Sequence, residues 1–207
     1  LVEEAGQAIP VPSSEVVFLN PVDQTFWSRL GASVDFGLSL TKANNTKQLN
    51  GRGAVDYAAD LWSTSGRVDV LRNAQDEVDT TKRSEIAGDF RRYFADKWFG
   101  IGSANFLQST ELGLDLRSAY VGGVGTHLVR NNRWRLGVIG GAGVTTEDYA
   151  DPSLESVTSG EAVATLELVA FDIGVVDIYT TFSFLPSLTE SGRIRTNLST
   201  DFTWEII

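Results

Sequence analysis

The stretch that decides the fold is LDLRSAYVGGVGTHLVRNNRWRLGVIGGAGVTT, residues 114–146. On both sides of Asn131-Asn132 the residue types alternate with a period of two, the repeat of a β-strand whose successive side chains point to opposite faces. Asn tolerates the positive φ of a tight turn, so the pattern predicts a β-hairpin. One face of its second arm is apolar or small and consists of Trp134, Leu136, Val138, Gly140, Ala142 and Val144. Each arm exceeds the usual strand of about five or six residues, as membrane-spanning strands do.

The same alternation recurs along the chain and predicts an all-β, antiparallel up-and-down transmembrane β-barrel of about ten strands. Besides the two arms of the hairpin, the predicted strands are 27–42, 47–61, 65–73, 81–95, 98–109, 159–171, 175–186 and 193–204. Connections at one end are predicted to be tight, as at 62–65. Those at the other end are predicted to be longer, at 74–80, 147–158 and 187–192. Short turns at one end and longer loops at the other are typical of outer-membrane barrels. An even number of strands predicts that both termini lie on the short-turn, periplasmic side.

The chain of 207 residues divides into a lead-in and one domain. Residues 1–25 contain three prolines and no sustained period, and are predicted to be a segment on the periplasmic side. Residues 26–207 are predicted to form the barrel. The chain begins with Leu1 and contains no methionine, so we expect it to start after processing or trimming, of which the removal of a secretory signal is one form. No apolar run reaches the roughly 18 residues of a transmembrane helix, but the signal of a membrane barrel is alternation.

Composition excludes several functional classes. The net charge of -10 argues against a nucleic-acid partner. The absence of cysteine excludes disulfides, thiolate nucleophiles and cysteine metal sites. The single histidine, His127, excludes a multi-histidine metal site, and its strand phase places it inside the barrel beside Arg130 and Arg133, where a lipid substrate would not reach. We therefore expect no enzymatic activity, no catalytic residue and no cofactor.

Two further motifs have structural interpretations. Acidic residues gather around two predicted loops without the regular spacing of a calcium loop, so we expect solvated loop surface and no metal site. They are Asp76, Glu77 and Asp79, and then Glu147, Asp148, Asp151 and Glu155. The glycines of 122–143 lie within strands, where glycine more often marks curvature or close backbone approach than a phosphate loop.

Alternation alone does not choose between a membrane barrel and a soluble lipocalin-like barrel with an apolar ligand inside. The tryptophans favour the membrane, because all of them fall at predicted periplasmic strand ends, where indole rings lie at headgroup level. The predicted membrane-interface girdle consists of Trp27, Trp62, Trp98, Trp134 and Trp204.

The charged phase of the strands also favours a membrane barrel, because it is rich in arginine, which pairs with carboxylates in confined space. The predicted luminal polar network consists of Arg29, Asp35, Arg52, Asp56, Arg83, Glu85, Asp89, Arg91, Asp115, Arg117, Arg135, Glu161, Glu167, Asp177, Arg193, Arg195 and Asp201. A barrel of about ten strands is filled by such side chains, so a self-filled lumen is expected in preference to a pore.

The segment GASVDFGLSLTKANNTKQLN, residues 31–50, resembles the opening of the salt-induced outer-membrane protein family, small bacterial barrels carried as a domain of unknown function. Phe36, Gly37, Ser39 and Thr41 match its Phe-Gly-x-Ser-x-Thr strand, and Asn45-Thr46 match part of its Gly-Asn-Thr turn, whereas Ala43-Asn44 depart from the usual glycine. The segments 114–129 and 138–149 resemble later strands. The resemblance implies an outer-membrane location and no established activity. Family chains continue by another hairpin, which would give twelve strands.

The resulting expectation is a non-enzymatic barrel in the bacterial outer membrane with a structural, scaffolding or interaction role. It would contact outer-membrane lipid and other envelope proteins through the N-terminal segment or the loops. A narrow channel for ions or small solutes is the first alternative, and a soluble barrel binding an apolar ligand is the second.

Overall fold

The computed structural model describes residues 2–4, 7–9, 25–42, 46–75, 78–94, 97–173 and 176–204. Two short strands, β1 (Val2–Glu4) and β2 (Gln7–Ile9), pair with each other in a separate hairpin. The remainder of the predicted lead-in, apart from Thr25, lies outside the described residues. A single turn of 3-10 helix, η2 (Phe26–Arg29), precedes the main sheet. Among the described residues, no helix is long and apolar enough to cross a membrane.

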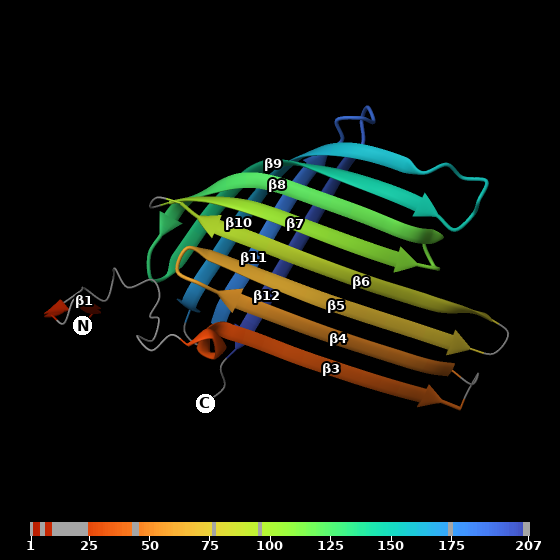
Figure 1. Ribbon diagram of the computed structural model, residues 1–207, viewed down its shortest axis with the longest axis horizontal. Coiled ribbons are helices and arrows are strands. Elements are labelled where there is room, and N and C mark those ends of the chain that lie inside the picture. Colours follow the sequence, from red (N-terminus) through yellow and green to blue (C-terminus); the bar gives the residue numbers. More distant parts are fainter. Residues whose placement is uncertain are drawn as a thin grey trace.

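Ten long strands form one antiparallel sheet in which each strand pairs with its neighbours in the sequence (Figure 1). The strands are β3 (Leu30–Thr41), β4 (Thr46–Ala58), β5 (Trp62–Gln75), β6 (Val78–Tyr93), β7 (Trp98–Ser109), β8 (Leu114–Arg130), β9 (Trp134–Tyr149), β10 (Val157–Ile173), β11 (Val176–Pro186) and β12 (Ile194–Trp204). The predicted all-β, up-and-down topology is confirmed. The sheet curls so that β10, β11 and β12 cross behind the earlier strands. Within the described residues it does not close, and β3 and β12 are its two edges.

The hairpin of β8 and β9 lies near the middle of the strand order. Gly123 of β8 and Gly141 of β9 are opposite each other in register. A Cβ atom at Gly123 would lie 2.8 Å from the carbonyl oxygen of Gly140, so the backbones approach more closely here than any other residue permits. This observation agrees with the predicted structural role of the glycines.

The predicted connections need two corrections. The tight turn expected at 62–65 lies at 59–61, because Ser63, Thr64 and Ser65 continue the ladder of β5 with β4. The long loop expected at 74–80 is mostly strand, since β5 extends to Gln75 and β6 begins at Val78. The long loop expected at 147–158 is shorter and covers 150–156, since β9 extends to Tyr149 and β10 begins at Val157. Asp79, Glu147 and Asp148 therefore belong to strands, while Asp76 and Glu77 lie outside the described residues. Polar side chains resemble loop sequence, but they can equally point from a strand into solvent or a hollow.

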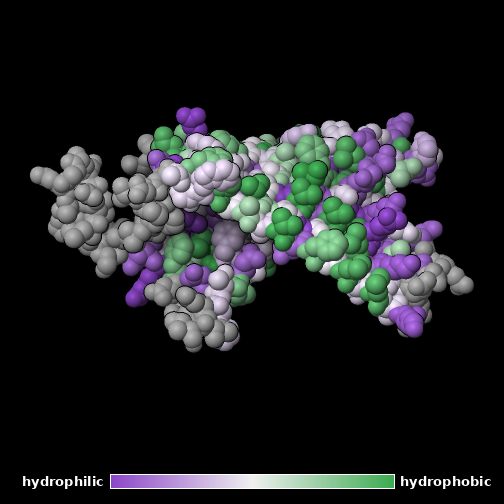
Figure 2. All heavy atoms as spheres, turned by 60° about the horizontal axis from the view of Figure 1, so that its bottom comes forward, coloured by the Kyte–Doolittle hydropathy of each residue, from purple (hydrophilic) through white to green (hydrophobic). Residues whose placement is uncertain are grey.

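The two faces of the sheet differ in character. The convex face carries large apolar side chains in solvent contact: Val34 is 86% exposed, Phe36 74% and Leu198 71%. Figure 2 shows hydrophobic groups gathered across the middle of the visible face, with hydrophilic groups more frequent toward its right-hand end. Most of the buried residues lie on the concave face. The apolar phase of the alternating strands therefore points outward.

Candidate functional site

The concave face has an apolar centre that the alternation did not predict. Phe99 and Leu107 on β7 are buried, with exposed fractions of 0% and 1%. Side chains from four other strands are buried on this face as well: Ala87, Ile139, Val163, Val169 and Leu185. The expectation of a polar interior is therefore incomplete. The signal was present in 98–109, where both phases are largely apolar and the inner one contains Phe99, Ile101 and Leu107.

A ladder of opposite charges crosses β4, β5 and β6 on the concave face. The Arg52 guanidinium donates to Asp69 at 2.5 Å, and the Arg67 guanidinium lies 3.7 Å from Asp69 and 3.5 Å from Glu85. Glu85 also accepts hydrogen bonds from Arg83 at 3.0 Å and Asn105 at 2.7 Å. Arginine's planar fork suits such shared carboxylate contacts. With Asp35, these ion pairs line a hollow of about 760 Å³, so the ladder is only partly buried.

One ion pair joins strands that are far apart in the sheet. Arg91 of β6 donates through Nη2 to Oε1 of Glu167 of β10 at 2.6 Å, and both side chains are largely buried. The Arg91 guanidinium also lies 4.5 Å from the ring centroid of Phe99, a cation–π distance. The ring of His127 lies 4.8 Å from that of Phe99. His127 is thus packed within the interior cluster, as its strand phase predicted.

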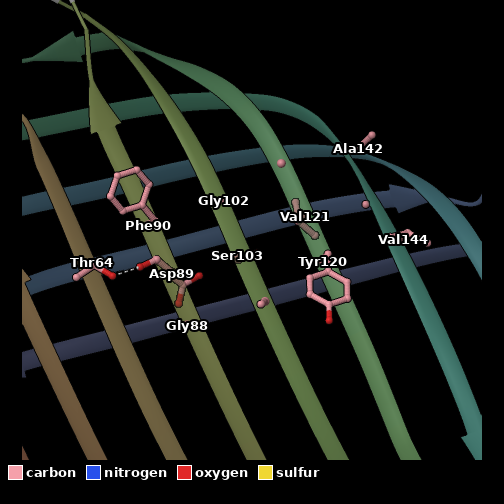
Figure 3. A pocket seen from close by; sticks show the side chains of 13 residues that line it. Thr64, Gly88, Asp89, Phe90, Gly102, Ser103, Tyr120, Val121, Ala142 and Val144 are labelled. Atoms are coloured by element: carbon pink, nitrogen blue, oxygen red, sulfur yellow. Dashed lines mark hydrogen bonds between the residues drawn. The ribbon is translucent and has the colours of Figure 1, made fainter.

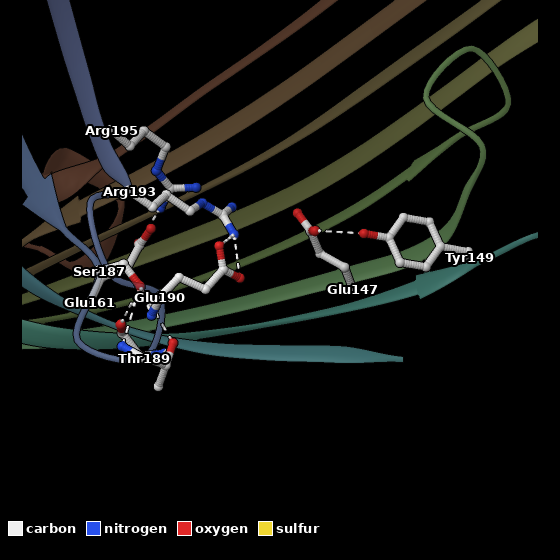
Figure 4. A network of polar contacts seen from close by, with 9 residues as sticks. Glu147, Tyr149, Glu161, Ser187, Thr189, Glu190, Arg193 and Arg195 are labelled. Carbon is white, nitrogen blue, oxygen red and sulfur yellow. Dashed lines mark hydrogen bonds and ion pairs between the residues drawn. The ribbon is translucent and has the colours of Figure 1, made fainter. Parts of the chain in front are cut away.

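A second polar network lies where β11 turns into β12 (Figure 4). Glu161 of β10 accepts a hydrogen bond from Arg195 of β12 at 2.5 Å. The connection 187–193 folds onto β10, where the Leu188 amide donates to the Gly160 carbonyl at 2.7 Å. Within this connection Arg193 donates to both carboxylate oxygens of Glu190, at 3.0 and 3.1 Å, and this ion pair raises the pKa of Arg193. The connection folds in this way because β10 extends beyond the end of β11. Its residues hydrogen-bond to the backbone of β10 that β11 leaves unpaired.

The structure brings together only part of the predicted luminal network. Arg29 and Arg193 form ion pairs with Asp60 and Glu190, two acids outside the prediction. Asp56, Asp89 and Arg135 line a further hollow of about 700 Å³ on the concave face, and Arg135 also lies over the ring of Phe171. Asp115, Asp177 and Asp201 are exposed, and Arg117 is half-buried. In the described part of the chain, no three histidine or acidic side chains are grouped as metal ligands would be.

The tryptophans lie at one end of the sheet. Trp62, Trp98 and Trp134 are the first residues of β5, β7 and β9, Trp204 is the last residue of β12, and Trp27 lies in η2 just before β3. In an up-and-down sheet these positions share one end, and all five side chains are exposed. They belong to a larger aromatic series at this end, in which Phe26 stacks on Tyr57 and Tyr57 contacts Trp62.

The middle of the convex face contains a shallow apolar hollow of about 850 Å³ (Figure 3). The rings of Phe90 and Tyr120 lie on either side of it, and Gly102 lies between them. Gly102, Gly122 and Ala142 are in register on β7, β8 and β9, so a row of small residues forms its floor. The lining of this hollow has few polar atoms. Asp89 is the charged residue among those that line it.

In a comparison with protein families, the family described as "Protein of unknown function, DUF481" matches residues 34–207. The chain belongs to the DUF481 family. No curated protein and no solved structure matches it.

The DUF481 match covers both interior polar networks and the apolar hollow. It begins at Val34 within β3 and includes the rest of that strand and all of β4 to β12. The hairpin β1–β2, η2 and Trp27 precede it. The DUF481 description states no activity, so the function has to be argued from the geometry of the two faces.

Proposed function

We propose that this DUF481 chain is a small barrel of the bacterial outer membrane, of the salt-induced outer-membrane protein family, with a non-enzymatic, structural or scaffolding role. In this proposal β3 and β12 pair to close the sheet. They run in opposite directions, so the pairing would continue the antiparallel order of the sheet. Closure removes both exposed edges, which are otherwise templates for aggregation.

The observation that carries the proposal is the outward apolar phase. Leu166 and Phe182, near the middle of β10 and β11, are 42% and 43% exposed on the convex face. A soluble barrel with an apolar ligand requires such side chains in its cavity, and the water-facing phase would then be the charged one. Contiguous apolar surface of this extent is typical of contact with a partner or with lipid.

Strand length and the tryptophans support a membrane as that partner. The ten strands contain 11 to 17 residues, and roughly 9–11 residues suffice for a tilted strand to cross a bilayer. An exposed aromatic series at one end of the sheet suits the headgroup region, where indole rings are part apolar and part hydrated. The same end would face the periplasm.

The interior supports a structural role. Its apolar centre and the Arg91–Glu167 and Arg195–Glu161 ion pairs occupy the concave face with the chain's own side chains. The single histidine is packed on Phe99, which is a poor arrangement for attack on a lipid ester. A scaffold would use the connections at 150–156 and 187–193, or the N-terminal segment, to hold another envelope protein.

Fractionation and refolding test this proposal. The full chain should sediment with outer membranes, float with phosphatidylcholine vesicles after refolding, and run faster on a gel when unheated, as compact barrels do. Capture of a partner from detergent-solubilised envelopes would then test the scaffolding role. Recovery of a folded, monomeric chain from the aqueous fraction without detergent would contradict the membrane proposal.

A narrow channel is the second candidate, and it draws on a separate observation. The hollow beside Asp35, Arg52 and Arg83 is lined by charged side chains that remain partly exposed. A closed sheet would enclose this hollow as a polar space. Steady single-channel steps from the wild-type chain in a planar bilayer would favour the channel over the self-filled scaffold.

A further inference from the structure

The Arg91–Glu167 ion pair spans the interior, unlike the charge ladder. Three strands, β7, β8 and β9, separate β6 from β10 in the sheet order. The two side chains therefore meet across the concave space, with 2.6 Å between Nη2 and Oε1. By contrast, Arg52–Asp69 joins the adjacent strands β4 and β5 and runs along the sheet.

The pair is held in place by packing. The guanidinium of Arg91 rests on the fully buried ring of Phe99, and that ring also lies near the rings of Tyr93 and His127. Glu167 is itself buried, with 9% of its surface exposed. The Arg91 side chain is already held by Phe99, so it loses little additional conformational freedom when it forms the ion pair with Glu167. The pair is therefore preorganised.

We propose that the Arg91–Glu167 ion pair is the barrier that keeps the barrel interior closed to ions. This inference rests on the proposed membrane barrel and deepens it, because it names the residues that make the lumen non-conducting. The pair lies toward the tryptophan end, since Arg91 is near the end of β6 and Phe99 near the start of β7. An ion that enters from that end meets a neutralised pair beside the Phe99 ring, and Arg91 and Glu167 both line the interior hollow of about 700 Å³.

The two halves of the pair predict opposite selectivity when one is removed. In Arg91→Ala the carboxylate of Glu167 remains without its partner and lines the opened passage, which favours cations. In Glu167→Ala the guanidinium of Arg91 remains, which favours anions. The exchanged variant Arg91→Glu with Glu167→Arg restores a pair of opposite charges and should close the passage again.

The test is single-channel recording of the full chain in planar phosphatidylcholine bilayers across a KCl gradient. Insertion of each variant is first established by vesicle flotation and gel mobility without heating. Wild type and the exchanged variant should be silent, whereas Arg91→Ala and Glu167→Ala should show steady steps with reversal potentials of opposite sign. Arg52→Ala is the matched control, because it removes an arginine from a pair of neighbouring strands, and it should stay silent. Glu167→Gln replaces Glu167→Ala if the latter does not fold.

The outcomes are distinguishable. Inserted but silent Arg91→Ala and Glu167→Ala or Glu167→Gln variants overturn the barrier, and so do steps in wild type that equal those of the variants. Steps from Arg52→Ala of the same size also overturn it, because any lost arginine would then open the lumen. A wild-type chain that does not enter vesicles contradicts the proposed membrane barrel itself.

Discussion

Adjacent residues of one strand face opposite sides of the sheet, and introducing a charged residue at each position tests which side faces lipid. Leu198 is exposed on the convex face near the middle of β12, and Asn197 lines a hollow on the concave face. An arginine at a lipid-facing position near the midplane costs about 2–4 kcal/mol. We therefore expect Leu198→Arg to lower the free energy of unfolding by about 2–4 kcal/mol and Asn197→Arg by less than about 1 kcal/mol.

Urea unfolding from phosphatidylcholine vesicles, followed by tryptophan fluorescence, measures both variants. Equal, small losses for Leu198→Arg and Asn197→Arg would mean that the convex face meets water.

Phe99 is the residue on which the interior cluster depends most. It is fully buried, and it contacts Arg91, Tyr93 and His127. Phe99→Ala leaves a cavity beneath the Arg91 guanidinium and should lower the free energy of unfolding by about 3–5 kcal/mol. Phe99→Leu keeps much of the volume and should cost clearly less. The same unfolding measurement decides, and a loss below about 1 kcal/mol for Phe99→Ala would show that the ring is not part of a packed core.

At the residue scale, the sequence predicts which face a side chain belongs to better than it predicts the partner of that side chain. The period of two assigns Arg91 and Glu167 to the same face, but no local pattern shows that strands four places apart meet across the interior. Phe99, Ile139 and Leu185 illustrate the other limit: each is apolar on the predicted polar phase, and only the curl of the sheet shows that all three are buried.

The bend of β8 and β9 is an element-scale property with a glycine test. Gly123 faces the concave side, and a Cβ there would lie 2.8 Å from the Gly140 carbonyl oxygen and 3.3 Å from the Gly141 Cα. Gly122 faces the convex side, and a Cβ there would meet nothing within 4 Å. Overpacking typically costs about 1–3 kcal/mol. We expect Gly123→Ala to lower the free energy of unfolding by about that amount and Gly122→Ala to leave it nearly unchanged.

Parallel unfolding curves of these two neighbouring variants provide the measurement. If Gly122→Ala were as destabilising as Gly123→Ala, the close approach of the β9 backbone to Gly123 would not account for the cost of Gly123→Ala.

Element boundaries show where sequence reasoning worked and where it did not. The strands 98–109, 175–186 and 193–204 were predicted to within one residue, because clear turn residues bound each of them. The start of β5 was missed by three residues, since Ser63 and Ser65 resemble turn sequence although both pair with β4. Acidic strand ends such as Glu147 and Asp148 were assigned to a loop for the same reason. Polar residues indicate contact with water, and such contact does not exclude a strand.

At the scale of the whole molecule, the order of the strands followed from the sequence, and closure did not. Neighbouring strands joined by short connections pair almost by necessity, so the up-and-down order could be predicted from spacing alone. Pairing of β3 with β12 joins residues more than 150 positions apart, and no spacing signal specifies it. The apolar phase continues on both edges, at Leu38 on β3 and Leu198 on β12, and an edge so exposed requires a partner.

Disulfide crosslinking between the edge strands tests the closed, outward-apolar barrel most directly, because the chain has no cysteine of its own. Leu38→Cys is combined in turn with Thr196→Cys, Leu198→Cys and Thr200→Cys, three convex-face positions that sample neighbouring registers. Leu38→Cys with Leu49→Cys, which are opposite in register on β3 and β4, is the positive control. Leu38→Cys with Leu166→Cys of β10 is the negative control.

After mild oxidation in vesicles, peptide mass spectrometry identifies the linked residues. A closed barrel should form an intramolecular crosslink in at least one of the three β3–β12 combinations. Efficient crosslinking of the positive control with none in any β3–β12 combination would contradict it.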